Sequence, residues 1–216
     1  MNSYVETQLA LLFERRPQLL PIRSEICKAF ELLVDCYRCG GKLLACGNGG
    51  SCADSEHIVG ELMKSFLLKR PIAKEIRTEL EAQGEDGHRL AEQLEGALPA
   101  IALGGHNALS TAFLNDKDPL LVYAQQIMGF GKPDDVLLTI STSGNAKNCV
   151  FAARTARALG MKIIALTGNR DSALSELADV TIRVPSTETY VVQEYHLSVY
   201  HTLCAMLEGE FFSEEQ

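Results

Sequence analysis

The chain has 216 residues, of which 46% are hydrophobic and 22% charged, enough apolar material for the core of one α/β domain. Its formal net charge of −8, from 20 basic and 28 acidic side chains, argues against nucleic acid or an anionic membrane as a direct partner. A phosphate site in such a chain must depend on local backbone N–H groups, hydroxyls and helix N-termini.

The first six residues lack the basic and apolar regions of a signal peptide, and no apolar run approaches the roughly 18 residues that a membrane span needs. The seven cysteines are odd in number and scattered, as is typical of reduced thiols in the cytoplasm. Cys36 and Cys39 form a C-x-x-C, a spacing that zinc or redox sites use, but no second pair follows. We therefore interpret them as packing thiols.

From Ser3 to Tyr37 the apolar residues recur at helical spacing, with an interruption near Pro17 and Pro21. A short apolar strand at 42–46 then leads into a glycine-rich loop. Further along, the pattern predicts helices at 51–68, 107–114, 119–128, 146–159, 172–178 and 187–211, and strands at 98–103, 135–140, 161–167 and 179–184. Apolar strands that alternate with helices predict a parallel sheet covered on both faces.

The segment from Lys69 to Gly96 is charged and rich in glutamate. This composition predicts an inserted hairpin or helix that lies outside the core. We expect the whole chain, 1–216, to form a single domain. Because the segment follows the helix at 51–68, it could roof a ligand site there, or it could be a surface excursion.

Two loops follow predicted strands and precede helices, the position where ligands bind in parallel sheets. Ser141-Thr142-Ser143-Gly144-Asn145 offers three hydroxyls at a helix N-terminus, which suits a phosphate monoester and exceeds what a helix cap needs. Gly47-Asn48-Gly49-Gly50-Ser51 allows a close approach of the backbone to a ligand, although a tight turn would explain it equally well. It fits neither a Walker loop nor G-x-G-x-x-G.

His57 and Glu61 lie four residues apart on one face of the helix that follows the first loop. Such a pair can share a divalent metal or transfer protons, although surface pairs with this spacing are common. On the last helix, His196 and His201 lie about 140° apart and cannot both line one site, whereas Gln193 and His201 could converge by leaning toward each other.

Five motifs occur in order along the chain: G-N-G-G-S at 47–51, H-x-x-x-E at 57–61, N-D at 115–116, S-T-S-G-N at 141–145, and R-V-P at 183–185 with Q-E-x-H-x-x-x-x-H at 193–201. Together they resemble the phosphoheptose isomerase branch of the sugar isomerase (SIS) family, from about Gly40 to Leu207 apart from the insertion. The resemblance implies a three-layer SIS fold with a five-stranded parallel sheet between helices. It also implies a homotetramer with active sites between subunits, in which the N-terminal helical segment 1–39 and the last helix supply much of the interface.

The resemblance also implies the reaction: sedoheptulose 7-phosphate becomes D-glycero-D-manno-heptose 7-phosphate through an enediol, the first step toward heptose units of the cell envelope. Glu61 would be the general base and His201 its partner acid/base. The remaining roles concern the phosphate (Ser141, Thr142, Ser143), the sugar (Asn48, Gly49, Gly50, Ser51, Asn115, Asp116, Gln193) and a zinc ion (His57, Glu61, Gln193, His201).

The chain departs from the family pattern at three places. Ala146 stands where members usually have another phosphate-binding serine, and Tyr190 replaces a common acidic residue. The segment 69–96 is longer than in typical members.

Other functions remain possible at this level. One is a non-catalytic SIS module, either a phosphosugar-binding regulator or a protein associated with a replication initiator; such modules typically lack the base and the last-helix histidine that this chain has. An isomerase for another phosphosugar is a second possibility. An NAD-binding protein is disfavoured because the glycine fingerprint is absent from the sequence.

Overall fold

The computed structural model describes residues 2–213. At its centre lies a five-stranded sheet with the order β2-β1-β3-β4-β5, in which every neighbouring pair is parallel. The strands are β1 (Leu43–Gly47), β2 (Ala100–Ala102), β3 (Val136–Ser141), β4 (Lys162–Thr167) and β5 (Val180–Arg183). Because β1 pairs with β2 on one side and β3 on the other, the strand order reverses between β1 and β3, the point where ligands bind in open α/β sheets.

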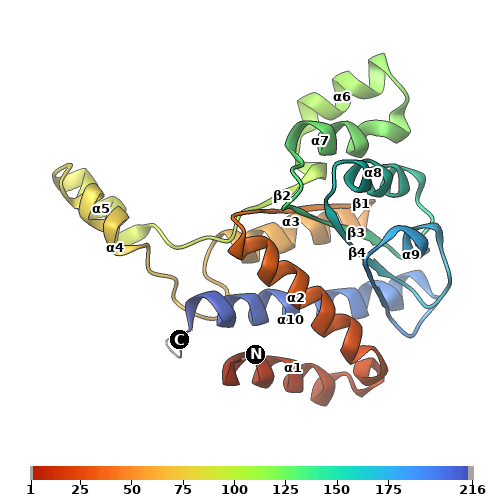
Figure 1. The fold of residues 1–216 in the computed structure, drawn as a ribbon, viewed down its shortest axis with the longest axis horizontal. Helices are drawn as coiled ribbons and strands as arrows, with labels where there is room; N and C mark the ends of the chain where they lie inside the picture. Colours follow the sequence, from red (N-terminus) through yellow and green to blue (C-terminus); the bar gives the residue numbers. More distant parts are fainter. Residues whose placement is uncertain (1, 214–216) are drawn as a thin grey trace.

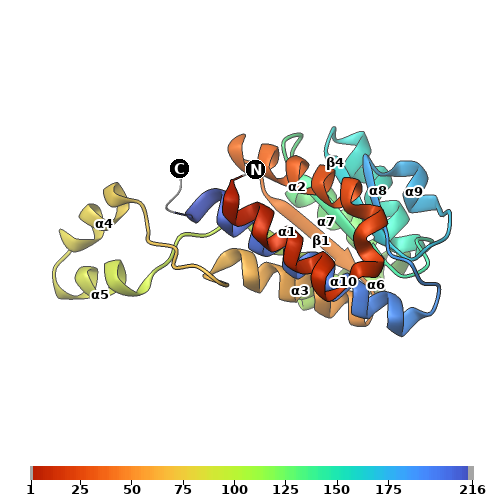
Figure 2. The ribbon, with the colours of Figure 1, turned by 90° about the horizontal axis from the view of Figure 1, so that it is seen from below.

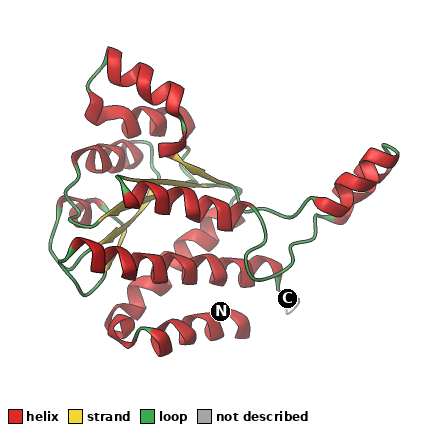
Figure 3. Cartoon of the chain, turned by 180° about the vertical axis from the view of Figure 1, so that it is seen from behind, coloured by secondary structure: helices red, strands yellow, loops and turns green. Residues whose placement is uncertain are grey.

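Helices cover both faces of this sheet (Figures 1 and 3). The α-helices are α1 (Ser3–Arg15), α2 (Arg23–Arg38), α3 (Gly50–Met63), α4 (Lys74–Glu81), α5 (Glu85–Gln93), α6 (Asn107–Asp116), α7 (Val122–Phe130), α8 (Lys147–Ala158), α9 (Ala173–Leu177) and α10 (Thr189–Phe212), with short 3-10 helices at Pro17–Ile22, Leu103–Gly105 and Pro119–Leu121. One apolar layer contains residues of α2, α3 and α10, and α1 lies alongside α10 (Figure 2). The opposite layer contains α7, α8 and α9. This arrangement confirms the predicted three-layer α/β fold.

The central strands β1 and β3 are buried at every position and are mostly apolar, because both of their faces are covered. In β1, Leu43 and Ala45 face the layer of α2, α3 and α10, whereas Leu44 and Cys46 face the layer of α7 and α8. Successive side chains of a strand point to opposite faces, so a continuous apolar run is what a doubly covered sheet needs.

The predicted helix at 51–68 is too long, because α3 ends at Met63. The reason lies on α10, where the carboxylate of Glu208 accepts hydrogen bonds from the backbone N–H groups of Phe66, Leu67 and Leu68 at 2.7–2.9 Å. A buried carboxylate thus takes the donors that further helical turns would have used internally.

Arg70 completes this arrangement. Its Nε donates to Glu208 at 2.8 Å, while its two terminal nitrogens donate to the carbonyls of Leu62 and Glu61 at 2.6 and 2.8 Å. The side chains of Arg70 and Glu208 are both fully buried. The segment after α3 is therefore fixed to α10 and to the backbone of α3.

The insertion forms a helical hairpin, α4 and α5, that projects away from the rest of the molecule (Figure 1). Within Lys74–Glu81 no residue is buried. Its base is narrow: the N–H of Gly96 donates to the carbonyl of Arg70 at 2.7 Å, and Pro71 and Glu95 form an antiparallel bridge. Within its own chain, this hairpin extends away from α3 and α10 and does not cover them.

The seven cysteines, all within the described residues, are free. Cys36 is buried and Cys39 is exposed, so the two differ in environment. Among the residues that the structure describes, no helix has the length and apolar character of a membrane span.

Candidate active site

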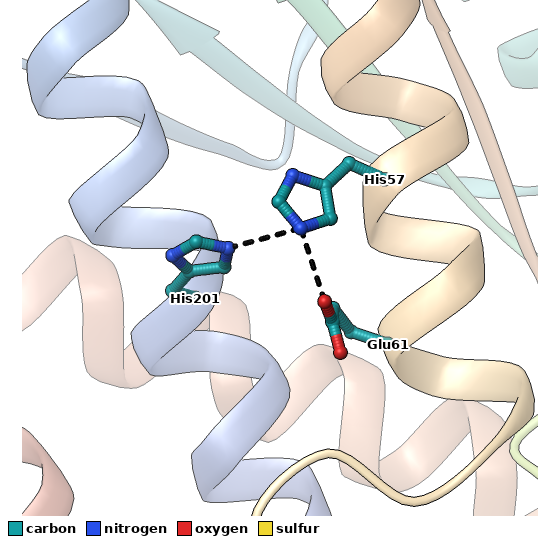
Figure 4. Close-up of side chains that lie close together, drawn as sticks. All are labelled: His57, Glu61 and His201. Atoms are coloured by element: carbon teal, nitrogen blue, oxygen red, sulfur yellow. Dashed lines mark hydrogen bonds and ion pairs between the residues drawn. The ribbon is translucent and has the colours of Figure 1, made fainter.

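His57 and Glu61 of α3 face His201 of α10, and the three side chains converge between the two helices (Figure 4). The Nε2 of His57 lies 3.0 Å from the Oε1 of Glu61 and 3.4 Å from the Nε2 of His201. On α3 the spacing of four residues places His57 and Glu61 one turn apart on the same face. His201 joins them only because α10 packs against α3.

The donor atoms of this cluster fit a divalent metal ion. One ligand atom from each residue lies within 4.8 Å of the others. Four ligands around a zinc ion at about 2.0–2.1 Å stand about 3.3–3.4 Å apart in a tetrahedron. The two separations from the Nε2 of His57, 3.0 Å to Glu61 and 3.4 Å to His201, are close to that value, and two imidazoles with a carboxylate are a common zinc-binding set.

Burial is uneven across the cluster. The side chain of Glu61 is 14% exposed and that of His57 is 44% exposed, so the carboxylate lies deeper than the imidazole. Burial lowers the pKa of His201, a nearby His57 charge lowers it further, and Glu61 opposes both. His201 therefore favours its neutral form, in which an imidazole can accept a proton or bind a metal.

A second layer of side chains lies behind His57. The hydroxyl of Tyr200 lies 3.0 Å from the Nδ1 of His57 and donates to the Oδ1 of Asp54 at 3.1 Å. Burial, followed by the neighbouring Asp54 charge, holds the pKa of Tyr200 well above its usual range, so the phenol keeps its proton. Burial also raises the pKa of Asp54, an effect that the hydrogen bond from Tyr200 opposes.

The two strand-end loops meet at the reversal point of the sheet. Asn48 of the glycine loop and Asn148 of α8 exchange two amide hydrogen bonds, at 2.9 and 2.7 Å. The phenol of Tyr123 donates to the carbonyl of Gly47, which fixes the end of β1. The glycine loop is therefore held against the start of α8.

The hydroxyl-rich loop is built around Gly144, whose φ of +67° favours glycine. A β-carbon there would also lie 2.1 Å from the hydroxyl oxygen of Ser172, so only glycine fits. Asn145 stabilises the turn, because its side chain donates to the carbonyl of Ser143 and accepts from the N–H of Ala173. Ser143 is exposed, and Thr142 is half-buried.

Ala146 is the N-cap residue of α8, and its methyl group cannot accept a hydrogen bond from the helix. The N-cap side chain therefore takes up none of the first N–H groups of α8, although the N–H of Cys149, the third residue of the helix, donates to the Oδ1 of Asn148 at 3.0 Å. Ala146 is the position at which the chain departs from the family pattern.

The remaining candidate residues lie in different places. Gln193 packs against Gly50, since its amide nitrogen would come within 2.9 Å of a β-carbon built there. Asn115 and Asp116 are exposed at the end of α6, where the amide of Asn115 donates to Asp116 at 2.9 Å. His196 is fully buried in the core, in agreement with the predicted separation of His196 and His201.

A groove of about 530 Å³ opens beside His201. Its walls come from α1, α10 and the segment after α3, and they include Arg15, Arg16, Phe66 and Leu67. The cluster thus has an open side that residues of its own chain leave accessible.

Sequence reasoning missed three residues that shape the site: Asp54, Tyr200 and Asn148. Asp54 lies three residues before His57 and so on the same helix face, a spacing that could have indicated it. Tyr200 and Asn148 carry no such signal, because helix packing and loop contact alone bring them to their partners.

Comparisons with known proteins identify the family of this chain. A family model described as "SIS domain" matches residues 18–97 and 90–168. The phosphoheptose isomerase of Akkermansia muciniphila is 32% identical over 212 residues, which cover 98% of this chain and 99% of that protein. The phosphoheptose isomerase of Shewanella oneidensis is 38% identical over 196 residues, covering 89% of this chain and 87% of that protein.

Among solved structures, the phosphoheptose isomerase of Neisseria gonorrhoeae superimposes with a TM-score of 0.73 and 29% identity, covering 95% of this chain and 97% of that one. The similarity to these three proteins covers nearly the whole chain. The chain therefore belongs to the SIS-domain family, in the branch of the phosphoheptose isomerases.

Proposed function

We propose that this chain is an aldose–ketose isomerase that converts sedoheptulose 7-phosphate to D-glycero-D-manno-heptose 7-phosphate. The observation that carries the proposal is the convergence of Glu61 and His201 with His57 between α3 and α10. A non-catalytic SIS module needs no such arrangement. The similarity to phosphoheptose isomerases over nearly the full length supports the same reaction.

The chemistry requires a proton to move from C1 to C2 of the sugar. The carboxylate of Glu61 removes a proton from C1, and the C2 carbonyl oxygen becomes a hydroxyl by taking up the proton that O1 releases, which leaves an enediolate with its negative charge on O1. Glu61 then returns the proton to C2 while the electrons of the enediol form the C1 aldehyde. His201, held neutral by burial, carries the hydroxyl proton from O1 to O2, so no net proton is gained or lost.

The phosphate fixes the sugar at a distance from the reacting carbons. Ser141, Thr142 and Ser143 would supply hydroxyl and backbone donors at the start of α8, where the helix dipole favours an anion. Asn48, Gly49, Gly50, Ser51, Asn115, Asp116 and Gln193 are the proposed sugar contacts. Anchoring of the distal end reduces the entropy lost at the reacting end.

A zinc ion is the proposed cofactor, with His57, Glu61, Gln193 and His201 as its ligands. When bound, a divalent ion supplies Lewis-acid stabilisation of the negative charge that develops on the enediol oxygens. The ligand spacing of His57, Glu61 and His201 supports this proposal.

The direct test follows the sugar by proton NMR. The purified protein is incubated with sedoheptulose 7-phosphate in deuterated water, with and without added zinc. We expect an aldoheptose 7-phosphate to form and deuterium to enter the sugar. A ketose that binds but stays chemically unchanged would contradict the proposal.

Substitution of the base gives a sharper test. Glu61→Gln preserves the shape of the side chain but removes its basicity, so turnover should fall by a factor of about 10² or more. Folding and phosphosugar binding should persist, measured by circular dichroism and by calorimetric titration. A variant with activity near that of the wild type would eliminate Glu61 as the base.

We further propose a homotetramer in the cytoplasm, with active sites between subunits. The open groove beside His201 and the exposed hairpin of α4 and α5 are surfaces that a neighbouring subunit could cover. The seven free cysteines suit a reducing compartment. Light scattering at several protein concentrations gives the oligomeric state directly, and a monomer at all of them would refute the tetramer.

A further inference from the structure

A chain of hydrogen bonds behind the catalytic cluster has a defined direction. Tyr200 is 1% exposed, and its hydroxyl touches Asp54 at 3.1 Å and His57 Nδ1 at 3.0 Å. A phenol has one proton to donate. A carboxylate only accepts, so the phenolic proton goes to Asp54.

The direction of that bond determines the tautomer of His57. With its only proton on Asp54, the oxygen of Tyr200 can meet His57 only as an acceptor. The Nδ1 of His57 must then carry a proton. In the neutral imidazole this leaves the lone pair on Nε2, the nitrogen 3.0 Å from Glu61 and 3.4 Å from His201.

A bare lone pair at that position would face a carboxylate oxygen and a second imidazole. That contact is repulsive unless a cation or a proton lies between the groups. Metal-binding histidines commonly donate their other ring N–H to a carboxylate or another polar group, which sets the tautomer and the ring orientation. Here a tyrosine links the carboxylate and the imidazole, and it comes from a different helix from both of them.

We propose that Tyr200 and Asp54 are positioning residues that hold His57 as the Nδ1–H tautomer and so direct its Nε2 lone pair at a divalent metal ion. This inference rests on the proposed metal-assisted isomerase, and it assigns to the site two residues that do not touch the substrate. The relay Asp54–Tyr200–His57 connects α3 and α10 and aligns the two helices that carry the cluster.

The test measures zinc binding by the metal-free protein, with a chromophoric chelator as competitor. Tyr200→Phe retains the buried ring and removes only the hydroxyl, and we expect zinc affinity to fall about 10- to 100-fold. Asp54→Asn, whose amide can still accept from the phenol, should lose less. Tyr195→Phe, on the same helix but about 140° away, is the matched control and should bind zinc like the wild type.

A spectroscopic readout separates positioning from a merely structural role. In the metal-free wild type, ¹⁵N NMR of the imidazole of His57 should show a protonated Nδ1, whether or not Nε2 also carries a proton. Tyr200→Phe should show a mixture of tautomers while its far-ultraviolet circular dichroism stays unchanged.

Three results would overturn the relay: a wild type that does not bind zinc, a Tyr200→Phe protein with wild-type zinc affinity, or a His57 protonated on Nε2 instead. Failure of the relay and failure of the proposed function are distinguishable. If the protein isomerises the sugar while Tyr200→Phe binds zinc normally, only the relay fails. If Tyr200→Phe loses zinc affinity but the wild type isomerises no sugar, only the function fails.

Discussion

The ion pair of Arg70 and Glu208 should be the most sensitive point of the fold outside the apolar core. Both side chains are fully buried, and Glu208 accepts hydrogen bonds from Arg70 and from the N–H groups of Phe66, Leu67 and Leu68. Arg70→Met removes the guanidinium and leaves a buried carboxylate without its cation. Breaking a buried pair in this way costs about 3–5 kcal/mol, a large part of the 5–15 kcal/mol typical of a domain.

The assay is urea denaturation followed by circular dichroism at one fixed protein concentration, since subunit association would otherwise change the apparent stability. Arg38→Met is the matched control. Arg38 pairs with Glu210, but its side chain is 61% exposed, so the loss should be at most about 1 kcal/mol. If Arg70→Met cost no more than Arg38→Met, burial of the pair would not be the source of its stability.

A double variant examines the role of the backbone donors. Many buried ion pairs can be replaced by apolar residues without a loss of folding stability. Arg70→Met with Glu208→Leu should nevertheless stay destabilised, because the N–H groups of Phe66, Leu67 and Leu68 lose their acceptor. A double variant as stable as the wild type would show that the segment after α3 finds other partners.

Two further predictions concern pH and the hairpin. Burial lowers the pKa of His196 from 6.5 to about 4, so between these pH values the unfolded chain binds a proton that the folded chain does not. The free energy of unfolding should therefore fall by up to roughly 3 kcal/mol as the pH falls through this range, and His196→Leu should remove this pH dependence. If the difference in unfolding free energy between the variant and the wild type were the same at pH 7 and pH 4, the prediction would be wrong. Pro71 and Glu95 already pair as antiparallel neighbours, so an Asn-Gly turn can join them in place of residues 72–94. The shortened protein should unfold cooperatively, with a stability within about 1 kcal/mol of the wild type. A thermal melt without a cooperative transition would show that the rest of the protein needs α4 and α5 to fold.

The amino-acid sequence by itself determined the alternation of strands and helices, and with it the fold class. The reason is local: β1 and β3 carry apolar residues on both faces, and the loops that follow them carry glycines and hydroxyls whose conformational and hydrogen-bonding properties need no distant partner. The spacing of His57 and Glu61 likewise placed both on one face of α3, because helix periodicity is a property of the backbone.

Tertiary structure decided what depends on contacts between distant segments. The end of α3 at Met63 follows from the carboxylate of Glu208, which lies 140 or more residues away in sequence from the N–H groups that it binds. Helix spacing alone did not choose between His196 and His201, and only the family resemblance named His201; the rotation of α10 against α3 is what buries one histidine and brings the other to the cluster. The link from Tyr200 to Asp54 and His57 has the same origin: hydrogen bonds of about 3 Å require two helices to be packed in one register, and sequence periodicity specifies each helix face but not the face that it meets.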